Sequence, residues 1–172
     1  MTQPSEGPAL TPSQRAGRAI RRTDQGRTLD AIHHLEAALG SAAPGREANW
    51  LADVFAALTN LNEATIEEQH NADQADSLLS DIARTQPRLR NRVRGLRAQY
   101  RQVRDTILTL REELGARRED NHPDYADVRQ RVTWLLAALR HQRSRESDLI
   151  YEAYYDAFNA DIETELGWWR RS

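Results

Sequence analysis

Apolar or aromatic residues recur at alternating steps of four and three positions between residues 89 and 114. Steps of three or four return to the same face of an α-helix, so the pattern predicts a helix with one continuous apolar stripe. Pro87 precedes this stripe and suits the first turn of a helix. A stripe this regular has to be buried against other helices, which constrains the fold more than any other feature. Its members are Leu89, Val93, Leu96, Tyr100, Val103, Ile107, Leu110 and Leu114.

Three other stretches show helical spacing of apolar residues, and they cover residues 28–39, 46–73 and 123–158. A shorter segment, 76–82, has Asp76 in the position of an N-cap and predicts an additional helix. Four amphipathic helices joined by short loops bury their stripes best as an antiparallel bundle. The sequence therefore predicts an all-α protein, an antiparallel four-helix bundle with a short extra helix between the second and third long helices.

The two ends of the chain differ in composition from the middle. Residues 1–23 contain three prolines and the basic run "RAGRAIRR", which is typical of a disordered basic arm. Residues 159–172 are acidic and then aromatic and basic, which predicts a C-terminal tail. We therefore expect the bundle itself to occupy residues 24–158.

Composition excludes several kinds of chemistry. The chain has no cysteine, and all 24 basic residues are arginine, so thiolate metal sites, cysteine nucleophiles and lysine Schiff bases are excluded. No nucleophile–base pair and no glycine-rich phosphate loop is recognisable, so we do not expect an enzyme. No apolar stretch approaches the length of a membrane span, and the first residues do not resemble a signal peptide, so we expect a cytoplasmic protein with no membrane contact.

Opposite charges gather on neighbouring predicted helices. Residues 46–84 contain eight acidic residues and two arginines, whereas residues 88–118 contain ten arginines and three acidic residues. This contrast favours a charge seam between the second and third long helices over a nucleic-acid surface, and the net charge of −2 agrees. We therefore do not expect nucleic acid as a partner.

Polar residues interrupt the apolar stripe on every predicted long helix. If the helices are antiparallel and in register, these residues meet in one layer of the bundle. Buried carboxylates are costly unless they are paired, hydrogen-bonded or bound to a cation. The layer therefore predicts a metal site or a closed hydrogen-bond network, unless a different register leaves its residues at the rim. Its members are His33, Glu36, Glu68, Tyr100, Gln142 and Glu146.

Three stretches of the sequence resemble the hemerythrin-like (HHE cation-binding) family, in particular a bacterial branch. They are "LEAALGSAAPGREANWL" (35–51), "DSLLSDIARTQPRLRNRVRGLRAQY" (76–100) and "LRHQRSRESDLIYEAY" (139–154). The resemblance implies a four-helix bundle. In the better-known members of this family, histidines on all four helices hold a di-iron centre that binds or senses oxygen.

The resemblance also implies that this metal site is degenerate. Three of the family's inward histidine positions fall at Glu68, Tyr100 and Gln142, and only His33 or its neighbour His34 fills the first position. We expect Tyr100 to be buried, with its hydroxyl bonded to a carboxylate such as that of Glu68 or Glu146.

These observations leave two functions open. The first is a non-enzymatic binding or interaction protein with a degenerate metal site and no cofactor. The second is a metal-binding protein that uses His33, Glu36, Glu68 and Glu146 to hold iron or manganese for oxygen or redox sensing, or for storage. The second function requires Glu36, Glu68 and Glu146 to lie close enough together to bind one ion, and the first does not.

Aromatic residues at the end of the chain predict a surface for self-association or for a protein partner, because a four-helix core cannot bury all of them. They are Tyr151, Tyr154, Tyr155, Phe158, Trp168 and Trp169.

Overall fold

Helices make up almost all of the computed structural model, which describes residues 9–41, 45–116 and 124–169, with side chains up to residue 159. No strand occurs among these residues, which confirms the all-α prediction. Nor is any helix within these ranges long and apolar enough to cross a bilayer. The elements are α1 (Pro12–Gly40), α2 (Glu47–Asp73), α3 (Leu78–Thr85), the 3-10 turn η1 (Pro87–Leu89), α4 (Arg90–Gly115) and α5 (Tyr125–Trp169).

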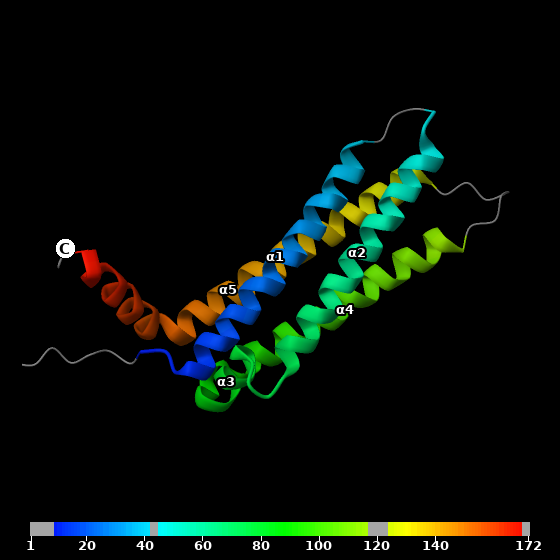
Figure 1. The fold of residues 1–172 in the computed structure, drawn as a ribbon. Coiled ribbons are helices and arrows are strands. Elements are labelled where there is room, and N and C mark those ends of the chain that lie inside the picture. Colours follow the sequence, from blue (N-terminus) through cyan, green and yellow to red (C-terminus); the bar gives the residue numbers. More distant parts are fainter. Residues whose placement is uncertain (1–8, 42–44, 117–123, 170–172) are drawn as a thin grey trace, which may run out of the picture.

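The long helices lie along one another, and α3 lies at the end where α1 begins (Figure 1). Backbones come close between α1 and α2, between α2 and α4, and between α4 and α5. Side chains link α5 to α1: the guanidinium of Arg143 donates to the carbonyl of Gln25 at 3.0 Å, and that of Arg129 donates to the carbonyl of Leu39 at 3.1 Å.

The core consists of two apolar clusters with polar residues between them. The first cluster draws on residues 31–61, 103–114 and 128–139, and the second on Leu10, residues 78–100 and residues 149–157. Buried polar side chains from α1, α2 and α5 occupy the intervening level, and we call them the buried polar layer. They are Asp24, Thr28, Asn62, Thr65, Glu68, Gln142 and Glu146.

The first helix begins at Pro12, so the expected disordered arm over residues 1–23 is wrong for its second half. Thr11 and Gln14 form a capping box: the Thr11 hydroxyl accepts from the Gln14 amide N–H at 3.2 Å, and the Gln14 side chain accepts from the Thr11 amide N–H at 2.9 Å. Leu10 is buried in the second cluster, which anchors this end. Residues 1–8 lie outside the described residues.

The last helix continues to Trp169 and bends at Tyr154, where φ is −120° and ψ is 17°, so the tail expected from residue 159 is helical up to Trp169. Tyr154 is buried, and its hydroxyl donates to Asp81 Oδ2 of α3 at 2.7 Å. Tyr151 and Tyr155 are exposed and pack edge to face, with ring centroids 5.2 Å apart. The side chains of Trp168 and Trp169 lie outside the described part, so association through this end stays a prediction.

Arginines of α4 and of the preceding turn η1 form ion pairs with two different helices. Arg97 Nε of α4 lies 3.1 Å from Asp73 Oδ1 at the end of α2. This ion pair is of the kind that the predicted charge seam between these two helices implies. Arg88 and Arg92, in contrast, both pair with Glu152 of α5. The basic face of α4 is thus divided between two acidic neighbours.

The capping box predicts how much the early start of α1 contributes to stability. Thr11→Ala removes the acceptor for the Gln14 amide, and we expect the free energy of unfolding to fall by about 1 kcal/mol in urea denaturation. Thr106→Ala is the matched control, because Thr106 is exposed on α4 and bonds only a carbonyl of its own helix. Equal free energies of unfolding for the two variants would show that the capping box does not stabilise the first turns of α1.

Candidate functional site

Glu68 lies in the buried polar layer and is the most deeply enclosed acid of α2, with 5% of its surface exposed. Its Oε2 accepts a hydrogen bond of 2.7 Å from the hydroxyl of Thr28 on α1. Both side chains are buried in the interior of the protein. One short hydrogen bond therefore holds this carboxyl group in place.

Glu146 enters the same region from α5 and is 3% exposed. Its Oε1 accepts from Arg21 Nε of α1 at 3.2 Å, and the same guanidinium donates to Ser147 Oγ at 3.3 Å. Oε2 of Glu146 is buried. The carboxylate also lies within hydrogen-bond reach of the Tyr100 hydroxyl of α4.

The two carboxyl groups influence each other. Burial raises the pKa of Glu68 from 4.5 to about 7, and the nearby charge of Glu146 adds to this effect. The hydrogen bond from Thr28 and the positive charge of Arg143 act in the opposite direction, and Asp24 makes a smaller contribution that raises the pKa. Glu68 therefore changes its charge near neutral pH.

Tyr100 of α4 is buried, as its place on the apolar stripe predicts. Burial, and then the charges of Glu146 and Glu68, raise the pKa of its phenol far above the usual value, so the hydroxyl stays protonated. As expected, this hydroxyl lies within hydrogen-bond reach of the Glu146 carboxylate, and that contact also raises the pKa of the phenol. A buried tyrosine normally finds such a partner.

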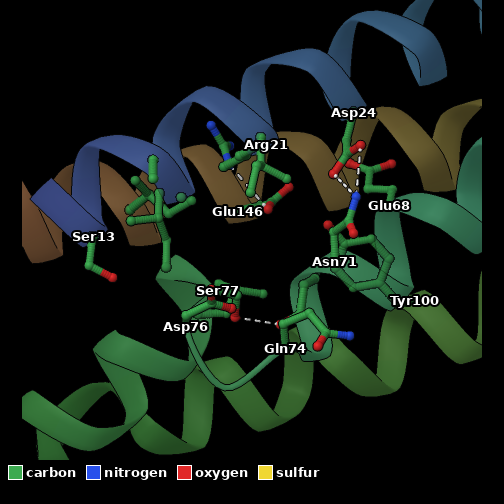
Figure 2. Close-up of a pocket in the computed structure, with 17 residues that line it drawn as sticks. Ser13, Arg21, Asp24, Glu68, Asn71, Gln74, Asp76, Ser77, Tyr100 and Glu146 are labelled. Carbon is green, nitrogen blue, oxygen red and sulfur yellow. Dashed lines mark hydrogen bonds and ion pairs between the residues drawn. The ribbon is translucent and has the colours of Figure 1, made fainter.

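A pocket opens between α1 and the connection from α2 to α3, and three residues of the buried polar layer, Asp24, Glu68 and Glu146, line it (Figure 2). Its cavity volume is about 90 Å³, and it is partly open to solvent. Glu68, Tyr100, Glu146 and Arg21 all contribute to its lining. Asp24 also lines it, and both oxygens of its carboxylate accept from Asn71 Nδ2, at 3.1 and 2.9 Å.

The structure does not bring the other predicted site residues to this pocket. His33 is exposed on α1. Glu36 is partly exposed and forms an ion pair with Arg140 of α5. Gln142 is buried in the polar layer with its Oε1 unpartnered, but it does not line the pocket. Of the four proposed metal ligands, only Glu68 and Glu146 meet.

Several pocket residues were missed by the sequence analysis. Arg21 and Asp24 lie on the early turns of α1, within or beside the stretch that the sequence predicts to be a disordered arm. The signal that could have found them is the "TPSQ" capping box of residues 11–14, which marks the true start of the helix. Among the described residues, no three His, Asp or Glu side chains are arranged to hold a metal ion.

Comparisons with protein-family models, curated proteins and solved structures gave no match to this chain. The resemblance to hemerythrin-like proteins therefore stays a prediction.

The raised pKa of Glu68 predicts a specific pH dependence of stability. Between pH 4.5 and about 7 the folded chain keeps a proton on Glu68 that the unfolded chain has lost, so this group makes stability fall as pH rises through that window. Glu68→Gln keeps an acceptor for Thr28 but cannot ionise. We expect the variant to match the wild type near pH 4.5 and to be more stable by about 3 kcal/mol at pH 8.

Urea denaturation at several pH values measures this difference. The control is Glu67→Gln, which changes the neighbouring exposed residue, an ion-pair partner of Arg27. The free energy of unfolding of the control should differ from that of the wild type by a small amount that changes little with pH. A Glu68→Gln variant that is less stable than the wild type at pH 8 would show that the ionised carboxylate stabilises the fold.

Proposed function

We propose that this chain is a non-enzymatic binding protein whose ligand occupies the pocket between α1 and the α2–α3 connection. One observation carries this proposal: three buried polar side chains, those of Glu68, Tyr100 and Glu146, line a pocket that reaches solvent. Buried polar groups are costly in the apolar interior of a protein. Their place in the wall of one opening is explained if a ligand binds beside them there.

The architecture that we propose is an antiparallel four-helix bundle of hemerythrin-like ancestry, with α3 as its short extra helix. In this interpretation the pocket is what remains of the metal layer. The positions of Tyr100 and Gln142 support it, because a phenol and an amide replace imidazole ligands there. The exposure of His33, His34 and His141 supports it as well, since none of them faces the buried polar layer.

The alternative is a carboxylate-rich iron or manganese site. Its support is that Glu68 and Glu146 lie close enough for one charge to raise the pKa of the other. A hard cation needs more oxygen ligands than two carboxylates supply. Glu36 and His33 would have to provide them, and the ion pair of Glu36 with Arg140 and the exposure of His33 weigh against that. The binding protein without a metal is therefore the better-supported proposal.

Metal content separates these two functions. We expect protein purified from cells grown with added iron and manganese to contain well under one metal ion per chain by elemental analysis, because imidazole ligands are missing from the interior. It should also lack the near-ultraviolet absorption of an oxo-bridged iron pair. About two metal ions per chain, reduced in Glu68→Gln but retained in Glu67→Gln, would establish the metalloprotein instead.

A steric test addresses the pocket itself. Gly17 lines the pocket, and a Cβ atom there would contact Leu78 at 3.4 Å, whereas a Cβ at Gly26 of the same helix meets nothing within 4 Å. Both Gly→Leu substitutions raise helix propensity equally. Ligand-observed NMR with fragments that carry amine, alcohol, amide or carboxylate groups should show binding to the wild type and to Gly26→Leu. We expect Gly17→Leu to lose that binding.

Fragments that bind Gly17→Leu as well as they bind Gly26→Leu would place binding elsewhere and refute the proposed pocket.

A further inference from the structure

The last part of α5 leaves the body of the molecule. The helix bends at Tyr154, whose hydroxyl donates to Asp81 of α3 at 2.7 Å, so the direction of the bend is fixed by a buried contact. Phe158 still contacts α1, because the Arg18 guanidinium lies 4.7 Å from the centroid of its ring. Figure 1 shows the part that follows, in red, directed away from the other helices. We call residues 155–169 the end segment of α5.

The sequence of the end segment is that of an amphipathic helix. Apolar or aromatic residues recur in steps of three and four, and acids occupy other positions, with no basic residue before Arg170. An isolated helix of this length is only marginally stable in water, so most of its stability has to come from packing. The apolar positions are Tyr155, Phe158, Ile162, Leu166 and Trp169, and the acids are Asp156, Asp161, Glu163 and Glu165.

A stripe of opposite charge runs along α4. Each member of the buried apolar stripe is followed directly by a member of a second stripe, which repeats with the same steps and consists mostly of arginine. Among these arginines only Arg97 forms an ion pair within the described part of the chain. Arg94 and Arg101 are exposed to solvent. The second stripe consists of Arg90, Arg94, Arg97, Arg101, Arg104, Leu108, Arg111 and Gly115.

Exposed apolar side chains of α2 lie on the side that faces this stripe. The Arg111 guanidinium lies 5.9 Å from the ring centroid of Phe55, and a Cβ atom at Gly115 would lie 3.4 Å from Cε2 of the same ring. Ile66 follows Phe55 after about three turns, so it lies on the same side of α2. Phe55 and Ile66 are 36% and 39% exposed. We call the arginine stripe together with these two residues the α2–α4 face.

The α2–α4 face stays basic when its acidic neighbours are counted. Its six arginines stand against four acids, one of which, Asp73, already pairs with Arg97 at 3.1 Å. The other three acids are exposed beside the face and are Glu63, Asp105 and Glu112. A helix that is acidic and has one apolar side matches this face in both properties, because its acids meet arginines and its apolar side covers exposed apolar side chains.

We propose that the end segment of α5 from one copy of this chain binds the α2–α4 face of a second copy. The chain carries both surfaces, and its own end segment is directed away from its own helices, so the face it meets belongs to another copy. When each copy places its end segment on the other, the contact forms twice, as a two-fold dimer requires. A nucleic acid would match the arginines but not the exposed Phe55 and Ile66.

Sedimentation velocity of the full chain over a hundredfold range of concentration tests this association. We expect a reversible dimer whose dissociation constant rises with salt, because salt screens the opposite charges. Arg94→Glu with Arg101→Glu should raise this constant at least tenfold, and so should Asp161→Arg with Glu165→Arg. All four substitutions in one chain should restore the dimer, which a folding defect would not allow.

Matched controls separate the proposed contact from general effects of charge and hydrophobicity. Arg22→Glu with Arg145→Glu changes the net charge equally at exposed arginines of α1 and α5, and it should leave the dissociation constant unchanged. Ile66→Ser should weaken the dimer several-fold. Leu29→Ser changes a similarly exposed apolar residue of α1 and should have no such effect.

Three results would overturn the inference. The first is a monomer at every concentration. The second is a dimer that the substitutions in the end segment weaken and those in α4 do not, because the end segments would then bind a different surface. The third is a DNA duplex that binds the wild type and loses affinity for the variant with Arg94→Glu and Arg101→Glu while no dimer forms, which would assign the α2–α4 face to nucleic acid.

Discussion

The burial of two carboxyl groups at one level of the helices is the constraint on which the rest of this structure depends. Glu68 and Glu146 lie between two apolar clusters, where an unpaired charge would be strongly unfavourable. Each is held by one contact from α1: the Thr28 hydroxyl on Glu68 and the Arg21 guanidinium on Glu146. The position of α1 against α2 and α5 is therefore tied to two specific polar contacts as well as to apolar packing.

The Arg21 contact requires α1 to be much longer than the stretch of residues 28–39 with apolar spacing. That stretch includes Thr28 and needs only about three turns of helix. Arg21 and Asp24 lie on the turns before it. The capping box at Thr11 and the burial of Leu10 let the helix start early enough to reach them. Gln14 adds a further tie, because its side-chain amide donates to Asp81 of α3 at 3.0 Å. The same extension forms one wall of the pocket, so the element that satisfies the carboxyl groups also encloses the space beside them.

The sequence predicted the helices well where apolar residues repeat and poorly where polar contacts determine the structure. The stripe from Leu89 to Leu114 is buried at all eight positions, because a strict helical period leaves one way to bury it. Glu68, Gln142 and Glu146 were found as polar members of such stripes. Arg21 and Asp24 were missed, since a run of arginines and small residues carries no apolar period and resembles a disordered arm. Glu36 was misplaced because the period alone does not show which stripe positions reach the interior and which, like Glu36, pair with an arginine at the rim.

A polar layer that served only to fix the register of the helices would be expected to satisfy its own hydrogen bonds. Such a layer gains specificity only when every buried group has a partner, because each free group adds a desolvation cost of roughly 1–3 kcal/mol. Glu68 comes near that condition, with Thr28 on one oxygen and a pKa that allows it to become neutral. Glu146 and Tyr100 come near it too, because Arg21 binds one oxygen of the carboxylate and the phenol lies within hydrogen-bond reach of the same group. Leucine in place of Tyr100 would continue the stripe without interruption. A role in fixing the register explains why the layer exists, but it does not explain why Glu68, Tyr100 and Glu146 line an open pocket, and this is the physical reason to look for function there rather than in the apolar clusters.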